Sequence, residues 1–418
     1  MNERKNVWSW NFTTITLGTV ISAIGGAAMN VAMGLVVFDN TNSSMLTAIF
    51  MAVSLVPNAL LPVIMGPYID NHKKKPMIYG LDLIMGVLYI AFGIHIFNKS
   101  FEYIPYMLFS IITGVLGSVY LQAYSAIYPD LIPKGFMQQG YSISSMIYPT
   151  VTILMAPVGA FVYAKLGIKW IFIIEGILLI IASLFEMTIK ISENCNKKQN
   201  KFSFTMYFND IVEGFRYLKK EKGIRNLYFY MTMTNALSQG TNLMALSYFQ
   251  TSSFLSTTMY GLLTSAETFG RMLGGFVHYF AKIKDKNKFK ITKTVYIIYN
   301  LFDGILLFLP FIGMLINRFV CGFLGVNSAT LREAAIQQYL KPNMRARINS
   351  LLSVAITSGV IIFRLIAGFL GEFLPYRTIA LIFAIIGLLS VHFIVIKNKD
   401  NIDPLFMSAK LKEAADKN

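Results

Sequence analysis

Runs of about twenty apolar residues recur along this chain, and they constrain its fold more than any other feature. A helix that crosses the hydrocarbon core of a bilayer needs about 20 mostly apolar residues. Hydrophobic residues make up 55% of the 418, charged residues only 14%, and the mean hydropathy is +0.55. The sequence therefore predicts an all-α integral membrane protein with twelve transmembrane helices. The expected spans are 12–38, 45–69, 77–97, 103–126, 141–164, 168–189, 226–250, 258–281, 292–312, 314–334, 348–371 and 376–396.

Basic residues gather on one side of these spans. The formal net charge is +16, and 29 of the 37 Lys and Arg residues fall in the N-terminus and every second connection. Cytoplasmic connections carry such an excess, so both termini are predicted to be cytoplasmic in a multi-pass protein of the cell membrane. Orientation explains the charge without a nucleic-acid partner. The basic residues assigned to the opposite side are Lys99, Lys165, Lys169, Arg318 and Arg377.

The two halves of the sequence share one plan. At a shift of 209 residues, Gly66 aligns with Gly275 and Pro133 with Pro342. Each half then has six spans that enter from the same side, and parallel repeats of this kind are typical of transporters with a substrate site between the halves. The predicted domains are two six-helix halves at 1–189 and 226–396, a cytoplasmic linker at 190–225, and a cytoplasmic tail at 397–418.

The linker carries apolar residues at helical spacing beside several basic ones. This pattern predicts an amphipathic helix that lies on the inner membrane surface in contact with lipids. A helix that binds a partner protein is the alternative. The apolar residues are Phe204, Phe208, Ile211, Phe215 and Leu218.

A charged break, GPYIDNHKKKPMI, separates the second span from the third. Its pattern, Gly66-x-x-x-Asp70 followed by Lys73, Lys74 and Lys75, resembles the signature loop of the major facilitator superfamily. Further residues resemble the branch with macrolide-efflux proteins and enterobactin-type siderophore exporters, and the similarity runs from about 8 to 397. These residues are Gly18, Ser22, Gly25, Thr41-Asn42-Ser43, Leu55, Pro57 and Asp82.

The resemblance implies a monomeric transporter that works by alternating access, usually as a proton antiporter. It also implies that the loop locks the cytoplasmic ends of the halves together. Asn71 and Lys73 depart from the pattern, because the family usually has arginine and glycine there. The residues concerned in this gate are Gly66, Asp70, Lys74 and Asp82.

The start of the eleventh span offers a partner for Asp70. A helix N-terminus presents unsatisfied N–H groups and the positive end of its dipole, and Arg345 and Arg347 add two guanidiniums. We expect Asp70 to dock there when the protein faces outward. The alternative is a loop whose lysines only set topology.

Several charged residues are predicted at membrane depth, where each is a candidate functional group because insertion is costly. The clearest cases are Glu175, Glu267, Arg271, Asp303 and Arg364, and Arg332 also falls inside a span. Glu267 and Arg271 share a helix face, and Arg364 lies at a depth that would let it meet Glu267. These groups either hold helices together as ion pairs or carry protons. Glu175 and Asp303 are favoured as proton carriers over Glu267, because no cation lies near them in sequence.

Amides occur in the spans that line the cavity in this superfamily. Asn30 and Gln239 are equivalent under the 209-residue shift and are expected to face each other across the central space. Such side chains either line a cavity or join helices by hydrogen bonds. A cavity with aromatic rings and a few amides suits bulky amphipathic compounds. The candidates for the substrate cavity are Asn30, Gln122, Tyr124, Asn235, Gln239 and Asn242.

Motifs for other chemistry are missing from the sequence. The four histidines do not form a metal-ligand spacing, and the sequence has no P-loop or dinucleotide fingerprint. We therefore expect no cofactor, and an integral-membrane enzyme would need clustered catalytic residues that are not visible. The sequence predicts an exporter of an amphipathic, macrolide-like small molecule driven by protons; an exporter of a siderophore or another self-made metabolite is the alternative.

Overall fold

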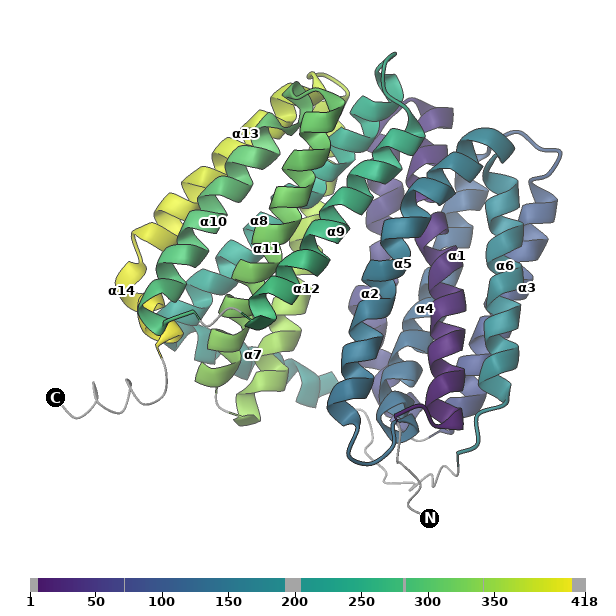
Figure 1. Cartoon of the computed structure of the whole chain (residues 1–418), viewed down its shortest axis with the longest axis horizontal. Coiled ribbons are helices and arrows are strands. Elements are labelled where there is room, and N and C mark those ends of the chain that lie inside the picture. The colour runs from purple at the N-terminus through teal and green to yellow at the C-terminus, as the bar shows by residue number, and fades with distance from the viewer. Residues whose placement is uncertain (1–6, 71, 192–203, 281–282, 341, 408–418) are drawn as a thin grey trace. The chain divides into compact units, whose positions relative to one another are not determined.

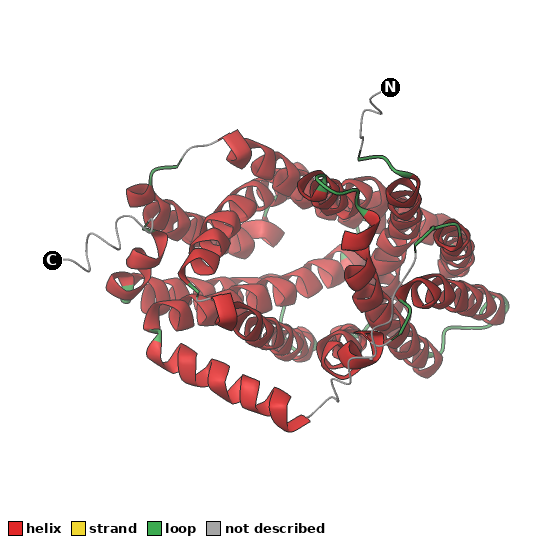
Figure 2. Ribbon diagram, turned by 90° about the horizontal axis from the view of Figure 1, so that it is seen from below, coloured by secondary structure: helices red, strands yellow, loops and turns green. Residues whose placement is uncertain are grey.

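The computed structural model describes residues 7–70, 72–191, 204–280, 283–340 and 342–407. Over these ranges the chain folds into helices joined by short connections, and no strand occurs within them (Figures 1 and 2). The long helices are α1 (Trp10–Thr41), α2 (Ser44–Asp70), α3 (Lys74–His95), α4 (Tyr103–Leu131), α5 (Met137–Leu166), α6 (Ile168–Met187), α8 (Lys222–Thr251), α9 (Thr257–Phe280), α10 (Asp285–Ile305), α11 (Phe311–Tyr339), α12 (Pro342–Gly371) and α13 (Tyr376–Ser390). The shorter helices are α7 (Phe204–Lys220) and α14 (Lys399–Ile402).

Each of the twelve predicted spans coincides with one long helix, which confirms the predicted membrane fold. In the described part of the chain, nine helices are long and apolar enough to cross a membrane: α1, α3, α4, α5, α6, α10, α11, α12 and α13. α2 contributes a shorter apolar stretch, Ser44–Asn58. α8 and α9 are long enough to cross, and both carry polar residues described below.

Local signals set the helix ends. Ser9 caps α1 by accepting a hydrogen bond from the Phe12 amide, and Asn42 ends it in the left-handed conformation, which asparagine tolerates. The ninth span was predicted to start at residue 292, but α10 begins at Asp285. Its first turns are rich in lysine, and Lys288 pairs with Asp285 at 2.7 Å. The helix therefore begins in a polar segment that a search for apolar runs excludes.

The chain divides into two compact units. The first comprises Met1–Asn42, Val53–Phe202 and Ser256–Ser265, and the second comprises Ser43–Ala52, Ser203–Leu255 and Ala266–Asn418. The first turns of α2 thus belong to the second unit, where Glu372 accepts hydrogen bonds from the Ser43 hydroxyl and the Met45 amide, each at 2.8 Å.

The same helix pairs recur in both units. In the first, α1 packs on α5 and α6, and α3 packs on α4 and α6. In the second, α8 packs on α12 and α13, and α10 packs on α11 and α13. These pairs are equivalent when the six long helices of each half are matched in order, as a parallel repeat requires.

A close crossing of α3 and α6 depends on glycine. A Cβ atom at Gly176 would lie 2.6 Å from the Gly86 carbonyl oxygen and 2.9 Å from the Ile90 amide, both backbone atoms that cannot move aside easily. By contrast, a Cβ atom at Gly117 in α4 would meet nothing within 4 Å.

We expect Gly176→Ala to lower the free energy of unfolding by about 1–3 kcal/mol, because overpacking forces the two helices apart. Gly117→Ala should be neutral or slightly stabilising, since alanine favours a helix by up to about 1 kcal/mol over glycine. Thermal unfolding of the purified variants would measure the difference. Equal midpoints for the two variants would contradict the proposed role of the crossing.

The predicted linker helix is present as α7, which lies crosswise to the long helices of its unit (Figure 1). Tyr217 and Leu218 pack against the core of the second unit, and a Cβ atom at Gly214 would overlap Leu351 of α12. Phe215 points outward with 62% of its surface exposed. Leu218, at the end of the predicted apolar face of this helix, is thus packed against protein. Phe215, on the same predicted face, is exposed and can contact a membrane or a partner.

Candidate functional site

A cavity of about 280 Å³ lies within the second unit, between α8, α9, α10 and α11. Its α8 wall is polar. Side chains four residues apart lie on one helix face, so several polar residues of α8 face the same cavity. The predicted residues Asn235, Gln239 and Asn242 all belong to this wall. The α8 residues that line the cavity are Tyr230, Thr234, Asn235, Ser238, Gln239 and Asn242.

The other walls supply rings and two guanidiniums. Tyr296 and Tyr299 come from α10, Arg271 from α9 and Arg332 from α11. Arg332 is only 8% exposed, and its Nη1 donates to the Tyr296 hydroxyl at 3.2 Å, while its Nε has no hydrogen-bond partner. No aspartate or glutamate is among the described residues that line this cavity.

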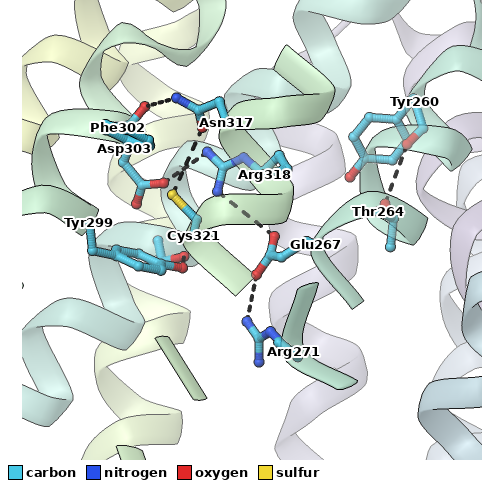
Figure 3. A network of polar contacts seen from close by, with 11 residues as sticks. Tyr260, Thr264, Glu267, Arg271, Tyr299, Phe302, Asp303, Asn317, Arg318 and Cys321 are labelled. Carbon is cyan, nitrogen blue, oxygen red and sulfur yellow. Dashed lines mark hydrogen bonds and ion pairs between the residues drawn. The ribbon is translucent and has the colours of Figure 1, made fainter. Parts of the chain in front are cut away.

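A chain of four charged side chains extends from the cavity wall into the protein (Figure 3). Arg271 Nη2 lies 2.5 Å from Glu267 Oε1, and the other oxygen of Glu267 lies 3.8 Å from Arg318 Nη1. Arg318 Nη2 in turn lies 2.8 Å from Asp303 Oδ1. The Arg271 side chain is 58% exposed, whereas that of Arg318 is 2% exposed. The two arginines and two acids therefore balance in charge. Arg318, which lies deeper in the protein, is far less exposed to water than Arg271.

Small residues make this arrangement possible. A Cβ atom on Gly270 would overlap the α11 backbone at Phe319, and one on Gly322 would overlap the α9 backbone at Glu267. The two helices therefore pack with their backbones in contact, which brings Arg318 of α11 within reach of Glu267. Asn317 donates to the Phe302 carbonyl at 2.9 Å and ties the same part of α11 to α10.

Three carboxylates are buried among the described residues of the first unit. Asp82 of α3 is 1% exposed, and Glu175 and Glu186 of α6 are 5% and 0% exposed. Tyr120 donates to Glu186 at 2.7 Å, but both oxygens of Asp82 and one oxygen of each glutamate have no hydrogen-bond partner. None of the three forms an ion pair with a described residue. This cluster thus lacks the cations that balance the acids of the second unit.

One glycine of α1 makes room for a glutamate of α6. A Cβ atom at Gly25 would overlap the Glu175 carboxylate, whereas one at Gly18 would lie 3.6 Å from the Glu186 Cγ, which is an ordinary contact. Both glycines belong to the α1 pattern noted in the sequence. Gly25 therefore has a physical reason in this structure, because it gives the Glu175 carboxylate space against α1.

The pattern of the Major Facilitator Superfamily matches residues 15–299 and 228–406, which together span most of the chain. The chain belongs to the major facilitator superfamily. Its members are transporters of small molecules, and this chain is a multi-pass membrane protein of that family.

Two relatives in the major facilitator superfamily cover most of the chain. Macrolide efflux protein A of Streptococcus pyogenes is 24% identical over 395 residues, covering 88% of this chain and 92% of that protein. The uncharacterized MFS-type transporter YvqJ of Bacillus subtilis is 21% identical over 371 residues, covering 86% of each chain. The chain is therefore similar to macrolide-efflux proteins, as its sequence motifs indicated.

Solved structures of other transporters share the fold. The nucleoside transporter NupG superposes with a TM-score of 0.69 at 14% identity, covering 91% of this chain and 97% of that one. A bacterial homologue of the iron transporter ferroportin, in an inward-facing state, gives 0.66 at 12% identity, with 91% and 98% covered. These similarities concern the fold and leave the substrate open.

The predicted cavity residues of the first unit have different surroundings. The Tyr124 hydroxyl lies 3.0 Å from the Thr19 hydroxyl, Gln122 donates to the Ser118 carbonyl of its own helix, and Asn30 is exposed on α1. The pairing of Asn30 with Gln239 across the central space stays a prediction, because these residues belong to different units.

The predicted cytoplasmic gate is described only in part. α2 ends at Asp70 and α12 begins at Pro342, but the side chains of Gly66, Asp70, Arg345 and Arg347 lie outside the described residues. Lys74 begins α3 and is partly buried. Asp82 lies inside α3, within the predicted third span, beside the carboxylates of α6. The gate therefore stays a prediction.

Three expectations about charges were wrong. Arg364 donates to Gln239 and does not pair with Glu267, whose partners are Arg271 and Arg318. Asp303 is not free of cations, because Arg318 reaches it from the next helix. Arg318 does not lie in an outer connection, because α11 starts seven residues before it and buries it.

Sequence reasoning also missed two functional candidates. Arg332 was recognised as a charge inside a span but was not connected with the cavity, because the sequence does not show which face of α11 meets α8. Glu186 was missed because it lies near the end of its span. Its spacing of eleven residues from Glu175 puts both on one face of α6, and that spacing was the available signal.

Proposed function

We propose that this protein exports an amphipathic small molecule from the cytoplasm by alternating access, with protons as the counter-ion. The similarity to Macrolide efflux protein A along 88% of the chain carries the export proposal, so macrolide-like compounds are the first substrates to test. The cavity of the second unit supports it, because three tyrosines and three amides suit a compound with an apolar body and polar groups. We propose a monomer with both termini in the cytoplasm.

Glu175 is our candidate for proton carriage, together with Asp82 and Glu186. A carboxylate buried without a partner is costly while it is charged, and a bound proton neutralises it. Glu267 and Asp303 already have arginine partners that neutralise them. The contrast between an unpaired cluster in the first unit and a paired chain in the second supports a division of labour between proton carriage and substrate binding.

The lipid contact proposed for the linker rests on α7. Phe215 is exposed, and basic side chains occur on the same helix at Arg216, Lys219 and Lys220. Aromatic and basic residues together suit the inner leaflet of a membrane, where anionic lipids attract positive charge.

Inverted membrane vesicles test the proposed export. Their cytoplasmic face is outward, so an antiporter should accumulate a radiolabelled macrolide when the lumen is acidified, and a protonophore should abolish the accumulation. Vesicles that lack the protein are the control. Accumulation that ignores the imposed gradient would contradict proton antiport, and accumulation equal to the control for a panel of amphipathic compounds would contradict export.

A further inference from the structure

The guanidinium of Arg332 is a positive charge in the cavity that forms no ion pair with any described carboxylate. Its only hydrogen bond among the described residues goes to the neutral hydroxyl of Tyr296, at 3.2 Å. No described carboxylate forms an ion pair with it, and its Nε has no partner. Removing an arginine from water without such compensation is costly.

We propose that this cavity binds an acidic group of the transported molecule, a carboxylate or phosphate held by Arg332. The inference rests on the proposed export function and narrows its substrate class from amphipathic compounds in general to amphipathic anions.

The neighbouring charges do not cancel that of Arg332. Arg271, the other guanidinium of the cavity, is already paired with Glu267, and the Asp303 carboxylate is paired with Arg318. Glu333 follows Arg332 in sequence but lines a different hollow, with Met231 and Gln337. The cavity wall therefore carries a net positive charge.

The geometry suits an acid attached to an apolar or aromatic body. A guanidinium offers a planar set of N–H donors that matches the two oxygens of a carboxylate or phosphate. The rings of Tyr230 and Tyr296 lie beside it, with centroids 4.3 Å apart, and Asn235 and Ser328 add polar groups to the same walls. A compound with a basic amine would instead face two guanidiniums in this cavity.

Two probes with the same ring system and opposite charge test the proposal. We would measure binding of 2-naphthoate and of 2-naphthylmethylammonium to the full-length protein in lipid nanodiscs by calorimetry, and subtract the signal of empty nanodiscs. Wild-type protein should bind naphthoate at least about tenfold more tightly than the cation. A hydrogen bond between charged groups raises affinity by about tenfold or more.

Variants identify the group responsible. Arg332→Gln should weaken naphthoate binding about tenfold or more, and Arg332→Lys should retain much of it because the charge remains. The matched control is Arg216→Gln, which removes an exposed arginine on α7. This variant should bind naphthoate as the wild type does. Size-exclusion profiles would show whether each variant is folded.

Any of three outcomes would overturn the proposal. The wild-type protein could bind the two probes with equal affinity, or it could show no detectable naphthoate binding at millimolar concentration. The third outcome is folded Arg332→Gln that binds naphthoate as tightly as the wild type. The comparison of probes needs no variant, so it decides the question even if Arg332→Gln does not fold. Export of a macrolide by vesicles together with any of these results would retain the export function and reject only the acidic substrate.

Discussion

Methionine in place of Arg318 is expected to lower the stability of the folded protein by about 3–5 kcal/mol, the loss typical when one partner of a buried ion pair is removed. The Arg318 side chain is 2% exposed and lies between the carboxylates of Asp303 and Glu267. Its removal leaves Asp303 as a buried carboxylate with no ion-pair partner among the described residues. Thermal unfolding and the fraction of monodisperse protein after purification would measure the loss.

Arg271→Met is the matched control for this prediction. Arg271 pairs with the same Glu267, but its side chain is 58% exposed to the cavity, so water can replace it. Exposed ion pairs contribute about 0–1 kcal/mol. Equal losses for the two variants would show that burial does not decide the stability of this charge chain. The double variant Arg318→Met with Asp303→Asn should recover part of the loss, because it also removes the carboxylate that the single change leaves without an ion-pair partner among the described residues; Glu267 keeps Arg271.

Glutamine in place of Glu175 is expected to reduce transport driven by a pH gradient about tenfold or more. Glutamine has nearly the same shape but cannot gain or lose a proton, so a cycle that needs protonation at this position stops. Exchange of substrate at equal concentrations on the two sides should continue, because it needs alternating access but no net proton movement. Measuring both activities in the same vesicles separates coupling from folding.

Controls for Glu175→Gln come from an exposed carboxylate and from carboxylates that are paired with arginine. Glu102→Gln, at an exposed position before α4, should leave both activities unchanged. Glu267→Gln and Asp303→Asn should lose stability rather than coupling, since their carboxylates neutralise arginines. Undiminished gradient-driven transport by all three intramembrane variants, Glu175→Gln, Glu267→Gln and Asp303→Asn, would remove carboxylate coupling from the mechanism.

Much of the fold could be predicted because the bilayer limits the choices. Backbone groups in hydrocarbon must be satisfied within the segment, so a run of about twenty apolar residues is read as a helix. The same criterion placed the start of α10 too late, at residue 292 instead of Asp285. The first turns of this helix are lysine-rich and lie outside any apolar run.

Part of the candidate cavity was also predictable from one helix. Asn235, Gln239 and Asn242 lie within eight residues of α8, so helical periodicity alone groups them, and the structure finds all three on one cavity wall. The partners of the intramembrane charges were not predictable. Asp303 and Arg318 are fifteen residues apart on successive helices, and only the rotation of each helix about its axis decides that they meet.

A twelve-helix membrane protein with two repeated halves follows from the order of residues alone, because hydrophobic length and charge bias are local properties of the chain. Which charges are balanced depends instead on how the helices pack. The α9–α11 crossing at Gly270 and Gly322 lets Arg318 neutralise Glu267 and Asp303, while Arg332 faces a cavity whose described lining has no acid. The physical reason is that charge compensation depends on distances of a few ångströms between different helices, and these distances are set by side-chain packing rather than by the order of residues.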